Sequence, residues 1–183
     1  MLDALRRSRA LKAAHQAVAA RRAHAPEAAP EARRLFAILP EAEDASDRSQ
    51  RDAWAFLTSL DLAPGRIVPV TLGRDVGAPD RFAGSVLHIT DKELDWRGLP
   101  RRVVAHGLWT QRPDVALDLT GTFTLAAAYL VGGSPASVRI GLDPAPEAAP
   151  FYDLVVTGGP EALRRALGQI EPPILPVRAG HAR

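Results

Sequence analysis

The chain of 183 residues contains no cysteine. This absence excludes disulfide bonds, thiolate nucleophiles and zinc sites built on thiolates, and it fits a cytoplasmic protein. Long apolar runs are missing as well, because no segment approaches the roughly 20 apolar residues that a membrane-spanning helix needs. The basic N-terminus is not followed by an apolar stretch, so we do not interpret it as a secretory signal.

Glycine patterns that bind phosphate are absent where a nucleotide-binding fold would need them. A dinucleotide site requires closely spaced glycines directly after the first strand, so that a phosphate approaches the backbone. The segment at 40–44 contains no glycine and three acidic residues. The five histidines do not pair at a metal-binding spacing within one core element, and no serine lies in a nucleophile motif. We therefore expect no cofactor, no bound metal and no catalytic residues.

A strand, helix, strand pattern is present in the second half of the chain. Val115, Leu117 and Leu119 form an apolar run, residues 123–131 are apolar almost all round, and two glycines follow them. Such glycines are typical of a helix end, and residues 137–140 then alternate as in a strand. Two strands joined by a helix form a βαβ unit, which requires a parallel sheet.

The rest of the chain continues this alternation. We expect strands at 35–39, 66–72, 85–90, 115–119, 137–140 and 151–156, and core helices at about 49–60, 123–131 and 160–170. Residues 101–112 are ambiguous between a short helix and an irregular cover, and Pro69 indicates an edge position or a bulge. The predicted fold class is α/β, with a single Rossmann-like, doubly wound and mainly parallel sheet of about six strands. This domain would span 35–170, after a basic helical arm and linker at 1–34 and before an extended, proline-rich tail at 171–183.

Charge is divided unevenly between the arm and the domain. Residues 1–24 contain six Arg and Lys against one acid, a net of +5, whereas the remainder contains 17 basic and 20 acidic residues, a net of −3. Leu11, Ala14 and Val18 fall on one side of a helix, but the stripe is thin, so we expect a solvated or loosely docked helix. The alternative is an arm that contacts the phosphate backbone of a nucleic acid. The cations that would make those contacts are Arg6, Arg7, Arg9, Lys12, Arg21 and Arg22.

A second candidate site lies at the centre of the predicted sheet. In an open α/β sheet, ligands collect beyond the carboxyl ends of the central strands. The polar side chains expected there are Glu41, Asp118, Thr120 and Thr122. We favour a structural role for them, in which the side chains satisfy the first amides of the next helix, because no basic group is near them in sequence.

Trp96 is a third candidate. It lies in a turn-rich segment at 95–100, where it would stack on a base or a sugar while Arg97 contacts a phosphate. The alternative, which we favour, is an indole that fills the gap between the sheet and the segment at 101–112.

Several ordered motifs resemble a family of small bacterial proteins of unknown function. The resemblance covers most of residues 30–157, and its motifs are the apolar strand at 35–39, Leu-Asp-Trp-x-Gly-x-Pro at 94–100, Asp-Val-Ala-Leu-Asp-Leu at 114–119, Val-Arg-Ile-Gly at 138–141 and Phe-Tyr-Asp-Leu at 151–154. It implies a basic N-terminal arm on a Rossmann-like domain. It implies no catalytic residues, because the family has no assigned activity.

Residues 114–141 are also similar to the N-terminal, acceptor-side half of heptosyltransferase-like GT-B glycosyltransferases. Those enzymes need a second Rossmann-like domain to hold the nucleotide-sugar, and after residue 156 only one helix and a tail remain here. The similarity therefore implies a fold that is kept without the chemistry.

Three functions stay open from the sequence. The first is a non-enzymatic cytoplasmic protein that associates with a larger assembly, an RNA or a ribosome, through its basic arm. The second is a binder of a small molecule or nucleotide-sugar, a degenerate glycosyltransferase-like protein. The third is a protein–protein adaptor that uses the arm as a docking helix.

Overall fold

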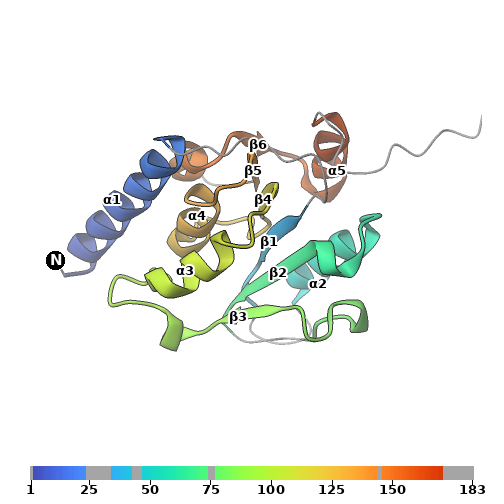
Figure 1. Cartoon of the computed structure of the whole chain (residues 1–183), viewed down its shortest axis with the longest axis horizontal. Coiled ribbons are helices and arrows are strands. Elements are labelled where there is room, and N and C mark those ends of the chain that lie inside the picture. The colour runs from blue at the N-terminus through green and yellow to red at the C-terminus, as the bar shows by residue number, and fades with distance from the viewer. Residues whose placement is uncertain (1, 24–33, 43–46, 74–76, 144–145, 171–183) are drawn as a thin grey trace, which may run out of the picture.

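The computed structural model describes residues 2–23, 34–42, 47–73, 77–143 and 146–170. It is an α/β protein with a six-stranded, fully parallel sheet in the order β3-β2-β1-β4-β5-β6 (Figure 1). This order is that of a doubly wound, Rossmann-like fold, so the predicted fold class is confirmed. The predicted tail at 171–183 and most of the predicted linker lie outside the described residues.

The elements follow the predicted alternation closely. The strands are β1 (Leu35–Leu39), β2 (Ile67–Leu72), β3 (Leu87–Ile89), β4 (Val115–Asp118), β5 (Val138–Leu142) and β6 (Leu154–Val156). The α-helices are α1 (Leu2–Ala23), α2 (Arg48–Ser59), α3 (Arg102–Trp109), α4 (Leu125–Gly132) and α5 (Gly159–Gln169). The ambiguous segment at 101–112 therefore contains a helix, α3, that begins two residues after the proline at residue 100.

The sheet is buried on both faces, as the continuous apolar strands require. All five residues of β1 are buried, and they alternate between two cores. On one face, Leu35 and Leu39 pack with the apolar side chains of α2 and α5. On the other face, Phe36 and Ile38 pack with those of α3 and α4. The result is a three-layer arrangement with the sheet in the middle.

Pro69 lies in β2, between β1 and β3 in the sheet. β2 is therefore an interior strand. However, β3 pairs with β2 only from Val70 onward, so Pro69 has a neighbouring strand on one side alone. A proline is tolerated at such a local edge because one side of the strand has no ladder to complete.

Helix α1 forms a further layer on α4 (Figure 1). Ala10 and Ala14 are fully buried and Val18 is nearly so, a stripe at i, i+4 and i+8 that faces the domain. The small alanines let the helix approach closely, and the Cγ2 atom of Val18 would lie 3.1 Å from a Cβ added at Gly132 of α4. The predicted helix is confirmed, but this face of it is docked rather than solvated.

Candidate functional site

The crevice expected at the centre of the sheet lies between β1 and β4, where the strand order reverses. Ile38 of β1 pairs with Asp118, the last residue of β4. The structure therefore places Asp118 at the switch point, where a ligand would bind in an open α/β sheet.

Asp118 is buried and its carboxylate is fully used inside the protein. Its Oδ1 accepts hydrogen bonds from the Thr120 backbone N at 2.9 Å and from the Thr120 hydroxyl at 2.6 Å. Its Oδ2 accepts a hydrogen bond from the Tyr152 hydroxyl. Burial raises the pKa of Asp118, and these hydrogen bonds lower it only in part. Burial also raises the pKa of Tyr152, and the neighbouring carboxylate raises it further.

The other two crevice candidates do not join Asp118 in one pocket. Thr122 is exposed, and its backbone carbonyl oxygen lies 2.7 Å from the Thr120 hydroxyl, whose single proton is shared between this oxygen and Asp118 Oδ1. Glu41 is exposed and lies just beyond β1, and its side chain extends toward β2, where its Oε1 would be 3.0 Å from a Cβ added at Gly73. These hydrogen bonds hold the turn at 118–122 together, so the role of Asp118 and Thr120 is structural. The predicted contact with the first amides of the next helix is wrong, because α4 begins only at Leu125 and no side chain caps it.

Two of the sequence motifs meet in the neighbouring strands. The backbone N of Arg139 in β5 donates a 2.9 Å hydrogen bond to Asp153 Oδ2, and its guanidinium Nη2 lies 3.3 Å from the same oxygen. Tyr152, which precedes Asp153 in the sequence, donates its hydroxyl hydrogen bond to Asp118 at the end of β4. The Arg139 side chain is buried and part of it is also bonded to the Ala136 carbonyl. These residues therefore join β4, β5 and β6 rather than form an open polar site.

The basic helix presents its cations at the surface. Arg6, Arg7, Arg9 and Lys12 are all exposed on the first three turns of α1. The two remaining candidates, Arg21 and Arg22, lie on the last turn, and their side chains fall outside the described part of the chain. Because the stripe of Ala10, Ala14 and Val18 packs against the domain, the helix keeps its exposed cations in a fixed position relative to the domain.

Trp96 lies beside this helix, which the sequence could not show. The guanidinium carbon of Arg9 is 5.7 Å from the centre of the Trp96 ring, within cation–π range. The indole remains 58% exposed, so it does not fill the gap beneath the cover segment, and that interpretation was wrong. An exposed aromatic ring and Arg9 of the basic helix thus share one surface.

Arg97 has a different role from the phosphate contact considered for it. Its Nε and Nη2 donate to Asp95 Oδ2 at 2.9 and 2.7 Å, while Asp95 Oδ1 accepts from the backbone N atoms of Arg97 and Leu99. Burial alone would raise the pKa of Asp95, but these hydrogen bonds outweigh it, so the pKa lies below its ordinary value. The ion pair fixes the turn that presents Trp96.

Within the described residues, no group of three or more His, Asp or Glu is placed to hold a metal ion. None of the helices in the described residues is both long and apolar enough to cross a membrane. The chain matches no protein-family model, and no curated protein matches it in sequence.

Proposed function

We propose that the protein is non-enzymatic and binds RNA, as part of a larger ribonucleoprotein assembly, through the surface formed by α1 and Trp96. The observation that supports this proposal best is the position of Arg9 over the exposed Trp96 ring. Proteins that bind single-stranded nucleic acid combine cations that follow the phosphate backbone with aromatic rings on which bases stack. Here both features occur on one surface, although they are far apart in the sequence.

The geometry favours an unpaired strand over a duplex. One face of the indole is near Arg9, and the exposed remainder is open for a stacked base. A stacked base contributes about 1–3 kcal/mol and does not depend strongly on sequence. Arg9 and Lys12, both exposed, supply charge for adjacent phosphates without reading bases.

The nucleotide-sugar alternative has less support. A ligand at the switch point would have to compete with the hydrogen bonds that already occupy both oxygens of Asp118. Thr120, the other buried candidate, is committed to the same turn. Asp118 and Thr120 already make hydrogen bonds to other groups of the protein, which is typical of residues with a structural role.

Fluorescence anisotropy with the full chain and a short labelled single-stranded RNA tests the proposal. Arg9→Gln combined with Lys12→Gln should weaken binding strongly at low salt. The matched control is Arg48→Gln combined with Arg165→Gln, two exposed cations of α2 and α5 across the sheet from α1. Equal affinity of the two double variants would contradict the proposal, because binding would then depend on charge wherever it lies.

Trp96 is tested separately, at constant charge. Trp96→Ala should weaken RNA binding about tenfold, which corresponds to about 1.4 kcal/mol of lost stacking. Trp96→Phe keeps a ring for stacking and should retain most of the affinity. If Trp96→Ala binds as tightly as the unchanged chain, the aromatic part of the surface has no role in binding.

A further inference from the structure

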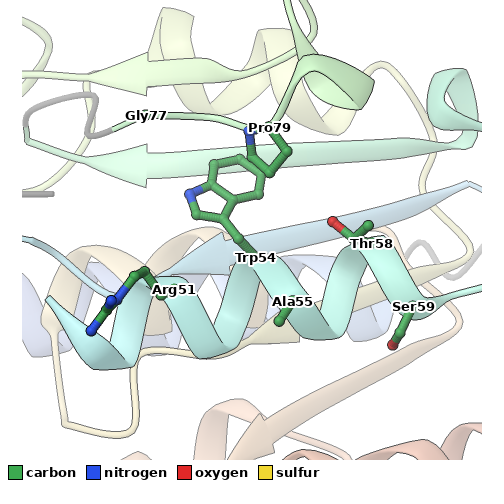
Figure 2. A pocket seen from close by; sticks show the side chains of 7 residues that line it. All are labelled: Arg51, Trp54, Ala55, Thr58, Ser59, Gly77 and Pro79. Atoms are coloured by element: carbon green, nitrogen blue, oxygen red, sulfur yellow. The ribbon is translucent and has the colours of Figure 1, made fainter. Parts of the chain in front are cut away.

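A groove lies beside α2 (Figure 2). It is on the face of the sheet opposite to the one that α1 covers. It has a volume of about 630 Å³, within the range of small-molecule sites. One wall is the outer face of α2 and the other is the segment at 77–79, which follows β2. The residues that line it are Arg51, Trp54, Ala55, Thr58, Ser59, Gly77 and Pro79.

The groove exists because the described part of the connection from β2 to β3, residues 73 and 77–86, contains no α-helix. In a doubly wound sheet each parallel crossover usually places a helix on the sheet. Among the described residues of this crossover, the helical structure is a short 3₁₀ turn, η2 (Asp80–Phe82), whose Phe82 is fully buried. The segment leading into η2 covers the sheet without filling the space next to α2.

Arg81 holds this wall in place. Its guanidinium donates hydrogen bonds to the carbonyl oxygens of Thr58, Leu60 and Leu62, at and beyond the C-terminal end of α2. A cation at this end of a helix also interacts favourably with the helix dipole. The two walls are therefore tied to each other at one end of the groove.

Trp54 supplies the observation that points to a ligand. Its side chain is 5% exposed and packs on Phe82, with ring centres 5.5 Å apart. Its indole Nε1 is buried and has no hydrogen-bond partner in the structure. Figure 2 shows the indole reaching from α2 toward Gly77 and Pro79, across the groove. A buried donor without a partner is costly, and native proteins seldom keep one without a reason.

The other lining residues indicate the chemistry of the missing partner. Arg51, Trp54, Ala55 and Thr58 recur at i, i+3, i+4 and i+7, so they share one face of α2. Ala55 and Pro79 make most of the contact surface apolar, while Arg51 brings an exposed cation one turn from the indole. A ligand with a flat apolar body and a negatively charged acceptor would match both parts.

We propose that this groove binds a small aromatic carboxylate, whose oxygen accepts a hydrogen bond from Trp54 Nε1 and whose charge is paired with Arg51. The ring of the ligand would lie against Ala55 and Pro79. The site is on the other face of the sheet from α1, and the proposal does not depend on RNA binding.

Nuclear magnetic resonance of the ¹⁵N-labelled full chain tests this site directly. The three tryptophans give three indole Nε1–H signals, and Trp54→Phe identifies the signal of Trp54 by its loss. If that variant fails to fold, the contact of Trp54 with Phe82 identifies the signal in the unchanged chain. Benzoate is the probe, benzamide is its uncharged counterpart and acetate is a carboxylate without a ring.

Benzoate should shift the Trp54 signal saturably and leave the signals of Trp96 and Trp109 in place. Arg51→Gln should weaken benzoate binding by up to about fivefold, the change expected for the loss of one exposed ion pair. Arg48→Gln, one turn earlier on the same helix and likewise exposed, is the matched control and should bind benzoate normally. Acetate and benzamide should each bind more weakly than benzoate.

Three results would overturn the proposal. The first is no saturable shift of the Trp54 signal at millimolar benzoate, because the buried indole donor would then have no carboxylate partner. The second is an equal shift of all three indole signals, which would indicate non-specific contact. The third is equal affinity of the Arg51→Gln variant and the unchanged chain, because the carboxylate would then have no cation partner.

Discussion

Tyr152→Phe is the substitution that most sharply tests the structural role of Asp118. Phenylalanine keeps the ring, and Tyr152 is 92% buried in a core that includes Phe151. Only the hydroxyl is removed, and with it the hydrogen bond to Asp118 Oδ2. Asp118 Oδ1 keeps both of its hydrogen bonds from Thr120.

The expected loss follows from the burial of the carboxylate. A hydrogen bond to a charged group contributes about 1.5–3 kcal/mol to the free energy of unfolding. For a chain of this length each 1 kcal/mol moves Tm by about 2–4 °C, so the variant should unfold about 3–12 °C lower. Urea unfolding should show a lower midpoint with an unchanged m-value, because the surface exposed on unfolding stays the same.

The loss should also depend on pH. Burial raises the folded-state pKa of Asp118 above its unfolded value. The contribution of this carboxyl to stability is therefore fully present below the unfolded pKa and is lost as pH rises through the folded pKa. Removing the Tyr152 hydroxyl removes a hydrogen bond that favours the charged form, so the pKa of Asp118 rises further. The stability difference between the unchanged chain and the variant should grow from acidic to neutral pH.

Tyr129→Phe is the matched control. Tyr129 is half-buried in α4, and its hydroxyl forms no hydrogen bond within the described part of the chain. This variant should change the free energy of unfolding by less than about 0.5 kcal/mol throughout the range from acidic to neutral pH. If Tyr152→Phe is equally mild, or if its effect does not change with pH, the assignment of Asp118 as a buried, internally bonded carboxylate is refuted.

Further substitutions test the packing and the helix ends. Gly133→Ala would place a Cβ 2.5 Å from Trp109 Cζ2 and should cost about 1–3 kcal/mol in urea unfolding, whereas Gly107→Ala, in open space on α3, should stabilise by about 0.4–1 kcal/mol. Arg81→Met removes the donors to the end of α2 and should lower the free energy of unfolding by about 1–2 kcal/mol; no change would mean that these bonds do not hold the wall of the groove. The side chain of Asp47 caps α2, and hydrogen bonds from the hydroxyl and amides of the first turn lower its pKa. Asp47→Ala should therefore destabilise at neutral pH, and the difference should vanish as pH falls through the folded pKa.

The sheet could be predicted from the sequence because each strand is recognisable from the apolar residues of its own short segment. A strand such as Leu35–Leu39 is apolar at every position, which is typical of a parallel strand buried on both faces. Helix α4 ends at Gly132, where the sequence predicted, but neither Gly132 nor Gly133 has the left-handed conformation expected of a glycine stop, and Gly133 instead admits the Trp109 ring. This role of Gly133 depends on a contact between two helices, so local pattern alone could not reveal it.

The surface features could not be predicted, because they depend on how distant segments meet. Trp96 was expected to pack, and nothing near it in sequence indicates that Arg9 would cover its ring. The extent to which α1 packs on the domain was underestimated, because the buried side chains Ala10, Ala14 and Val18 are small. Small side chains nevertheless favour packing, because they let two helices approach closely. The groove beside Trp54 arises from a missing crossover helix, which only the assembled sheet makes visible.

The salt dependence of RNA binding is the measurement that tests the central claim most directly. The logarithm of the association constant, plotted against the logarithm of salt concentration, falls with a slope of about −0.7 for each phosphate contact to a single strand. Arg9→Gln with Lys12→Gln should make this slope shallower by about 1.4, and Arg48→Gln with Arg165→Gln should leave it unchanged. Parallel slopes for the unchanged chain and the Arg9 and Lys12 variant, or no binding of RNA by the unchanged chain at low salt, would contradict the claim.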